Sequence, residues 1–170
     1  MVRATRRFTL HGASDAAFRE AIGPLFEGAP RFLARLAAAR PFGSSAAMFA
    51  RAREIAHAMP EAEQVELIDS HPRLGAPPAT VSTLSFREQG YEGESGATAS
   101  QARTAAELDR LNDAYETRFG FRYCVFVAGR PRAALLPAME AALVADRSAE
   151  IARALDAIVD IAADRWEKEQ

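Results

Sequence analysis

Apolar residues recur at spacings of three and four along most of this 170-residue chain, a pattern typical of helices that bury one face. The pattern predicts one helical turn at Ser85 and longer helices over about residues 15–22, 61–69, 100–118, 132–145 and 148–169. Two more begin near Pro30 and after Ser45, and they end at Arg40-Pro41 and before Pro60. A chain of this length can form one hydrophobic core. We therefore predict an all-α fold of about eight helices, forming a single domain over residues 1–170.

Two stretches lack a helical period. Residues 71–84 contain Pro72, Pro77 and Pro78, and an irregular stretch of this length is often functional. Residues 121–128 have the composition of a strand, but no second convincing strand is available to pair with them. Their backbone donors and acceptors must therefore bind loop backbone, helix ends or a ligand. We expect a proline-rich active-site loop and one short extended segment.

Charge and hydropathy exclude several classes of protein. The formal net charge is -2, which is unlike the strongly basic surface of a nucleic-acid-binding protein. No apolar run approaches the roughly 18 residues of a membrane-spanning helix. The basic N-terminal residues are not followed by the apolar core of a signal peptide. We expect a cytoplasmic protein with neither a nucleic-acid nor a membrane partner.

Scarce residue types narrow the possible chemistry further. Cys124 is the only cysteine and Lys168 the only lysine, which excludes an internal disulfide, a cysteine-cluster zinc site and a P-loop lysine. The helical spacing of His57 and Glu61 resembles a metal-binding pair, but Pro60 disturbs that register, so we expect no metal site. Cys124 lies in an apolar segment and fits a small core residue better than a nucleophile.

His71 and the segment after Ser85 are the main candidates for chemistry. His71 ends a helix and precedes Pro72, and a histidine with its ordinary pKa of about 6.5 can transfer protons at neutral pH. Alternatively, its imidazole satisfies the last carbonyls of that helix. Ser85 and Glu88 form a capping-box pattern in which both side chains cap the helix. In the functional alternative, Glu88 and Gln89 present a carboxylate and an amide to a small molecule rich in nitrogen and carbonyl groups.

Several motifs together resemble the 2-oxo-4-hydroxy-4-carboxy-5-ureidoimidazoline (OHCU) decarboxylase family. The motifs, in chain order, are Arg40-Pro41-Phe42, His71-Pro72-x-Leu74-Gly75, Ser85-x-Arg87-Glu88-Gln89, Leu111-Asn112-x-x-Tyr115-x-x-x-Phe119-Gly120-Phe121 and Ile161-x-x-x-Arg165. Each is short, and their order and spacing make the resemblance specific. It implies an all-α homodimeric enzyme that needs no cofactor or metal. Such an enzyme is a carboxy-lyase that converts OHCU to (S)-allantoin in urate breakdown.

The resemblance also implies roles for individual residues. His71 would be the proton donor, and Arg165 would be the family's late arginine. From the chemistry of the side chains we expect Arg165 to supply positive charge, and Glu88 to assist, either by handling the substrate's hydroxyl proton or by holding His71 in the required protonation state. The residues expected to bind the substrate come from the proline-rich loop, the segment after it and the extended segment: Pro72, Ser85, Phe86, Arg87, Gln89, Tyr123, Cys124, Val125, Phe126 and Val127.

The sequence departs from the family pattern at two places. Arg73 stands where many relatives have aspartate, and Glu92-Gly93-Glu94 replaces a small Ala-Gly-Leu stretch in a somewhat longer loop. Two other hypotheses also remain open. The chain could be a non-catalytic helical binding module that presents residues 123–127 to a partner. It could also be a paralogue that acts on a related ureido compound.

Overall fold

Eight α-helices and five 3-10 turns form the part of the chain that the computed structural model describes, residues 9–93 and 98–170. The α-helices are α1 (Asp15–Ile22), α2 (Pro30–Ala38), α3 (Ser45–Ala58), α4 (Glu61–Asp69), α5 (Thr83–Glu88), α6 (Ala99–Phe119), α7 (Leu136–Ala142) and α8 (Arg147–Lys168). The 3-10 turns are η1 (Thr9–Gly12), η2 (Gly23–Phe26), η3 (Pro78–Thr80), η4 (Tyr91–Gly93) and η5 (Arg132–Leu135). No strand occurs within these ranges, which confirms the predicted all-α class.

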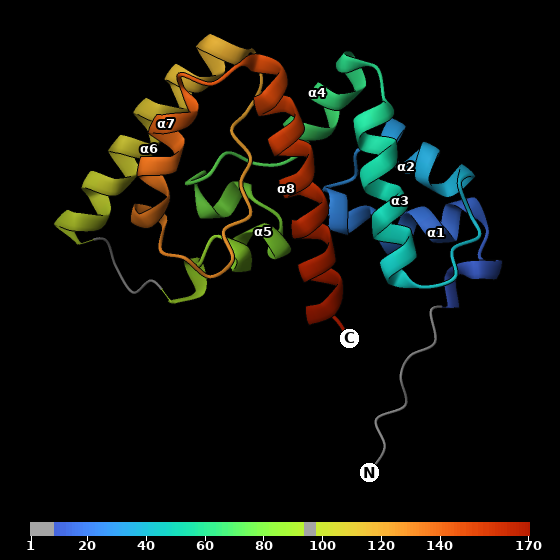
Figure 1. Cartoon of the computed structure of the whole chain (residues 1–170). Helices are drawn as coiled ribbons and strands as arrows, with labels where there is room; N and C mark the ends of the chain where they lie inside the picture. The colour runs from blue at the N-terminus through green and yellow to red at the C-terminus, as the bar shows by residue number, and fades with distance from the viewer. Residues whose placement is uncertain (1–8, 94–97) are drawn as a thin grey trace.

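Helix α8 runs through the middle of the molecule, with α1 to α3 on one side and α6 and α7 on the other (Figure 1). It packs against α3, α4 and η2. Its predicted apolar stripe of Ile151, Leu155, Ile158 and Ile161 is buried in the core. The same helix buries Arg165, whose charge needs partners at that depth. The longest helix therefore brings a charged side chain from the core to the functional site.

Serine caps fix the beginning of three helices, one of them not where the sequence pattern placed it. Ser14 and Ser44 accept backbone N–H groups at the starts of α1 and α3. Helix α5, in contrast, is capped by Ser82, whose Oγ accepts the Ser85 N–H at 3.1 Å. The capping role predicted for Ser85 is therefore wrong, because Ser85 lies inside the first turn of the helix, three residues after the cap. Its hydroxyl is free to bond other elements.

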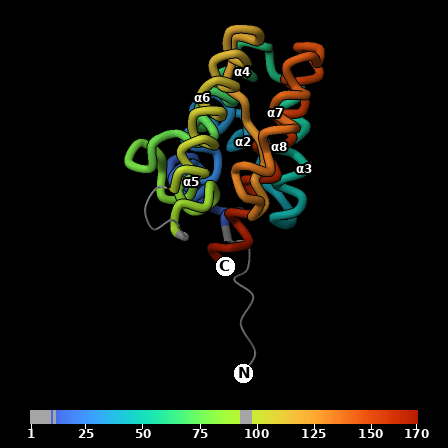
Figure 2. Tube along the Cα trace, turned by 90° about the vertical axis from the view of Figure 1, so that its left-hand side faces the viewer, coloured from blue at the N-terminus to red at the C-terminus, as the bar shows by residue number. Residues whose placement is uncertain are grey.

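The helices near the extended segment also differ in detail from the prediction. Residues 132–145 form η5 followed by the shorter α7, because the Pro137 nitrogen carries no hydrogen for an α-helical bond to the preceding turn. Helix α6 ends at Phe119, and Gly120 follows with a φ of 78° that makes a left-handed cap. Figures 1 and 2 both show α6 beside α7.

Arginine side chains bind the carbonyls of the extended segment, since no neighbouring strand does so. The Cys124 carbonyl accepts Arg153 Nη1 at 2.8 Å, and the Phe126 and Val127 carbonyls accept Arg130 Nη2 and Nε at 2.6 and 2.9 Å. Among the described residues, nothing accepts the N–H groups of residues 123–127. The segment therefore keeps a row of unused donors beside α5 and α8.

Two kinds of feature are absent from the described ranges. None of the helices there is both long enough and apolar enough for a bilayer crossing. Nor do three or more His, Cys, Asp or Glu side chains of residues 9–93 and 98–170 gather where they could bind a metal ion. His57 instead pairs with Asp156 on α8, at 2.8 Å from Nε2 to Oδ1.

Candidate active site

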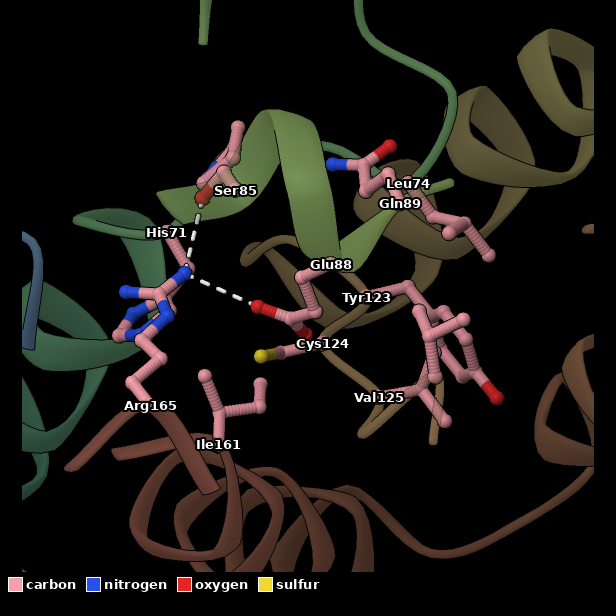
Figure 3. A pocket seen from close by; sticks show the side chains of 12 residues that line it. His71, Leu74, Ser85, Glu88, Gln89, Tyr123, Cys124, Val125, Ile161 and Arg165 are labelled. Atoms are coloured by element: carbon pink, nitrogen blue, oxygen red, sulfur yellow. Dashed lines mark hydrogen bonds and ion pairs between the residues drawn. The ribbon is translucent and has the colours of Figure 1, made fainter. Parts of the chain in front are cut away.

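A cavity lies between the loop after α4, helix α5, the extended segment and α8 (Figure 3). The space inside it that a water-sized sphere can occupy is about 20 Å³, which is below the range typical of small-molecule sites. Its walls come from four separate parts of the chain: His71, Pro72, Leu74, Ser85, Glu88, Gln89, Tyr123, Cys124, Val125, Val127, Ile161 and Arg165. Ten of these are residues that the sequence analysis assigned to the site; Leu74 and Ile161 are the two additions.

His71 presents a neutral imidazole in this cavity. The side chain is 3% exposed, and Nδ1 lies 3.3 Å from the carbonyl oxygen of Leu67 on α4. Burial, followed by the positive charge of Arg165, lowers the pKa of His71 to about 4. A carbonyl only accepts, so Nδ1 carries the proton and Nε2 holds a lone pair. Nε2 is buried and has no partner among the described residues, which leaves it for a ligand.

Arg165 joins three elements through one guanidinium group. Nη1 donates to the carbonyls of Pro24 and Leu25 at 3.3 and 3.2 Å. Nη2 lies 2.9 Å from each of three oxygens, on Glu27, Ser85 and Glu88. Figure 3 shows the guanidinium bonded to both Ser85 and Glu88. Nε is buried and lacks a partner in the described part of the chain, so it is the N–H that remains for a substrate.

Glu88 is a buried carboxyl with a single charge-paired oxygen. Its side chain is 12% exposed and its Oε2 accepts the Nη2 of Arg165. Burial raises the pKa of Glu88 above its ordinary value, and the neighbouring charge of Arg165 opposes that rise. Glu27 and Asp164 reinforce the rise with their negative charges. A carboxyl with a raised pKa holds a proton closer to neutral pH and can act as an acid.

Glu27 was not identified by the sequence analysis, although its side chain is as buried as that of Glu88. It follows η2 with a positive φ of 52°, and Oε1 accepts from Arg165, Ser82 and Ser85. In the sequence, Glu27 is one acidic residue beside Gly28 in a short connection. Nothing local indicates a partner 138 positions away.

The proline-rich loop is held in place by Gln89 and Arg73. Gln89 Oε1 accepts the Gly75 N–H at 2.7 Å, and Nε2 donates to the Arg73 carbonyl at 3.1 Å. Arg73 forms a two-pronged ion pair with Glu116 at 2.7 Å and a further contact with Asp113 at 2.9 Å. Arg73, which stands where many relatives have aspartate, therefore ties the loop to α6. In the second departure from the family pattern, the Glu92-Gly93-Glu94 stretch, Glu94 lies outside the described residues.

Three expected substrate-binding residues do not line the cavity. Phe86 packs its ring 5.5 Å from that of Tyr91, and Arg87 is exposed beside Glu92. Phe126 is half-buried and bonds Arg130 through its carbonyl. Their roles stay predictions from the resemblance.

Cys124 lines the cavity as a neutral thiol. Burial raises its pKa to about 12, so a thiolate is scarcely present at neutral pH. The side chain therefore contributes an apolar wall instead of a nucleophile, in line with its place in an apolar segment.

The fold and the cavity define a helical protein with buried groups suited to acid–base chemistry. The family model described as OHCU decarboxylase matches residues 11–167, and the chain belongs to this family.

Individual relatives of known name also support membership of this family. The chain is 33% identical over 143 residues to the uric acid degradation bifunctional protein PucL of Bacillus subtilis, covering 84% of this chain and 28% of that protein. It is 31% identical over 108 residues to the OHCU decarboxylase of Amia calva, covering 64% of this chain and 62% of the other. The chain thus spans less than two thirds of either relative. The Haloferax volcanii OHCU decarboxylase is 29% identical over 87% of this chain and 86% of its own length.

Two solved structures share the fold. One is an OHCU decarboxylase crystallised in the presence of (S)-allantoin, with a TM-score of 0.67 and 21% identity over 92% of this chain and 98% of that chain. The other is an (S)-allantoin synthase, with a TM-score of 0.65 and 17% identity over 94% of this chain and 52% of that chain.

Proposed function

We propose that this protein is a carboxy-lyase that converts OHCU to (S)-allantoin in urate breakdown, without a cofactor. One observation carries the proposal beyond family membership. A single cavity contains the free lone pair of a neutral His71 and the buried carboxyl of Glu88, which Arg165 orients. A base and an acid that face one small substrate are the groups this decarboxylation needs.

The substrate itself can accept the electrons that the reaction releases. In OHCU, the carbon that loses CO2 carries a hydroxyl group and adjoins a ring C=N bond. When the C–C bond breaks, its electron pair forms a C=C bond to the neighbouring carbon, and the C=N electrons move onto the ring nitrogen. The protein therefore needs only to orient the substrate, stabilise the developing charge and move protons.

We assign the proton transfers from the positions of the two groups in the cavity and from the directions of their pKa shifts. In its protonated form, which burial favours, Glu88 gives a proton to the ring nitrogen as the C=N electrons arrive there, and water returns a proton to Glu88 before the next turnover. His71 is neutral before substrate binds, so Nε2 first accepts the hydroxyl proton. The resulting imidazolium then donates that proton to one face of the ureido-bearing carbon, and the carbon–oxygen double bond forms. Delivery from one side fixes the S configuration, and a positioned acid or base is commonly worth about 10²–10⁴-fold in rate.

The walls of the cavity supply the remaining contacts in this proposal. The unused N–H groups of the extended segment bond the carbonyl groups of the ureido arm and ring. The Arg165 Nε–H is available to an oxygen that gains negative charge. Pro72, Val125 and Val127 provide apolar walls that limit the access of water.

We further propose that the protein works in the cytoplasm as a homodimer, without nucleic-acid or membrane partners. The formal net charge of -2 supports the absence of nucleic-acid binding. Sedimentation equilibrium tests the dimer: a single species of twice the chain mass supports it, and a monomer at micromolar concentration refutes it.

A coupled assay tests the activity. Urate, uricase and the hydrolase that opens 5-hydroxyisourate generate OHCU in place, and circular dichroism at an allantoin band then follows the S isomer with and without this protein. We expect an S signal whose rate is proportional to protein concentration. A racemic product formed at the spontaneous rate would refute the proposal and favour a binding module. Turnover of another ureido compound alone would favour the paralogue.

A further inference from the structure

We propose that Glu27 is a positioning residue for this reaction, whose carboxylate holds the Arg165 guanidinium against the first turn of α5 and so acts on Glu88 and His71 through Arg165. The inference depends on the proposed decarboxylase function and extends it. Glu27 is outside the lining of the cavity, so its action on the substrate passes through these groups.

The turn that carries Glu27 is shaped to hold the guanidinium group. Pro24 and Leu25, within η2, direct their carbonyls at Nη1 of Arg165, and Glu27 follows with its carboxylate at Nη2. A positive φ of 52° at Glu27 is uncommon for a residue with a side chain. Gly28 continues the turn with a φ of 77°. This tight reversal places a buried carboxylate opposite α8.

Glu27 also fixes helix α5 relative to Arg165. Its Oε1 accepts hydrogen bonds from the Ser82 hydroxyl, at 2.9 Å, and from the Ser85 hydroxyl. Ser82 caps the helix that carries Glu88, and Ser85 lies in the first turn of that helix. One carboxylate oxygen therefore receives three donors from two elements. Glu88, in contrast, has Arg165 as its only hydrogen-bonding partner among the described residues, and its other oxygen remains available.

The charges around Glu88 explain how Glu27 acts on it. The ionisable groups that face Glu88 come from α8, the η2 turn, the extended segment and the loop after α4: Arg165, Asp164, Glu27, Cys124 and His71. The histidine and the thiol are neutral at pH 7, so the guanidinium is the only positive charge in this set. With Glu27 present, that charge is shared between two carboxylates. Without it, the whole charge favours the ionised form of Glu88 and disfavours a proton on His71.

The sign of the expected effect follows directly. Removing the negative charge of Glu27 lowers the pKa of Glu88 and also lowers that of His71, since Glu27 raises both. Every limb of the pH–rate profile that reports either group therefore moves to lower pH. The direction is the same whether Glu88 acts as acid or base. A purely structural role would reduce the rate and leave the limbs in place.

The pH profile of kcat and kcat/KM for the purified full chain tests this, with OHCU as substrate. The variants are Glu27→Gln, which removes the charge, and Glu27→Asp, which keeps it on a shorter side chain. Glu63→Gln is the matched control, because it also removes one carboxylate from an Arg–Glu pair, on the surface between α2 and α4. Thermal unfolding of each variant accompanies the assay.

We expect Glu27→Gln to lower kcat by up to about 100-fold, since a misplacement of about 1 Å in a catalytic group can cost that much, and to shift the limbs to lower pH. Glu27→Asp should retain the wild-type limbs at reduced kcat, and Glu63→Gln should match wild type. Unshifted limbs in a folded Glu27→Gln variant would overturn the inference. If wild type itself fails to convert OHCU, the proposed function fails instead.

Carboxyl NMR of the wild-type protein with 13C-labelled glutamate provides a second readout that requires no variant at Glu27. The Glu88 signal, assigned by its loss in Glu88→Gln, should titrate above the range of an exposed glutamate, because burial and the negative charges of Glu27 and Asp164 raise the pKa of Glu88. Titration of Glu88 in the ordinary glutamate range would overturn the inference, even if Glu27→Gln does not fold.

Discussion

The buried, neutral state of His71 makes stability depend on pH in a way that one substitution isolates. The pKa of His71 is lowered to about 4 in the folded protein, whereas an unfolded chain has the ordinary value of about 6.5. Well above pH 6.5 the imidazole is neutral in both the folded and the unfolded state, so it does not change the free energy of unfolding with pH. As the pH falls from 6.5 to 4, the unfolded chain takes up a proton that the folded protein does not, so the folded state is destabilised.

The size of the effect follows from those two values. At pH 5 the protonation of His71 in the unfolded chain lowers the free energy of unfolding by about 2 kcal/mol, and at pH 7.5 this effect is close to zero. His71→Asn removes the titrating group and keeps an amide N–H for the Leu67 carbonyl. The difference in unfolding free energy between wild type and this variant should therefore change by about 2 kcal/mol between pH 7.5 and pH 5.

Urea denaturation at the two pH values measures this difference. Other titrating groups contribute to both proteins and cancel in the comparison. His57→Asn, on α3, is the matched control for losing an imidazole outside the cavity. If the wild-type and His71→Asn free energies differ by the same amount at both pH values, His71 is not held neutral by the fold. The assignment of Nε2 as the initial proton acceptor would then be wrong.

Three further substitutions test other parts of the account. Glu88→Gln should keep the fold and lower kcat by about 10²–10⁴-fold; wild-type turnover in the coupled assay would contradict the acid role. Tyr115→Phe removes a buried 2.6 Å hydrogen bond to Glu150 and should cost about 1.5–3 kcal/mol in urea denaturation; an unchanged midpoint would contradict that estimate. Gly75→Ala should destabilise by at least about 1–2 kcal/mol, because φ is +81° and the new Cβ would lie 2.9 Å from Leu108 Cδ1; wild-type stability would show that the loop can shift.

Most helices were predictable from the sequence, because local signals determine where they begin and end. Helix α1 begins after the serine cap at Ser14, and α4 begins after Pro60; both span the residues that the apolar pattern predicts. The start of α5 was wrong because Ser82 and Ser85 both fit a capping position, and the sequence alone does not rank them. Tertiary contacts decide between them, since the Ser85 hydroxyl bonds Arg165 and Glu27.

The sequence motifs predicted which residues belong to the candidate site, but not their protonation states. The motifs place His71, Glu88 and Arg165 in one family pattern, and the structure brings all three to one cavity. Their protonation states were not predictable, because burial at His71 is a property of the packed molecule. Glu27 was missed for a related reason: an acidic residue in a short turn resembles a solvated surface residue until α8 is packed against it.

The most direct test compares wild type and His71→Ala on freshly generated OHCU, with circular dichroism for the S isomer and thermal unfolding for the fold. We predict that wild type forms (S)-allantoin well above the spontaneous rate and that the folded variant yields only the slow racemic product. Near-normal formation of the S isomer by His71→Ala would contradict the claim that this imidazole transfers the stereochemistry-determining proton.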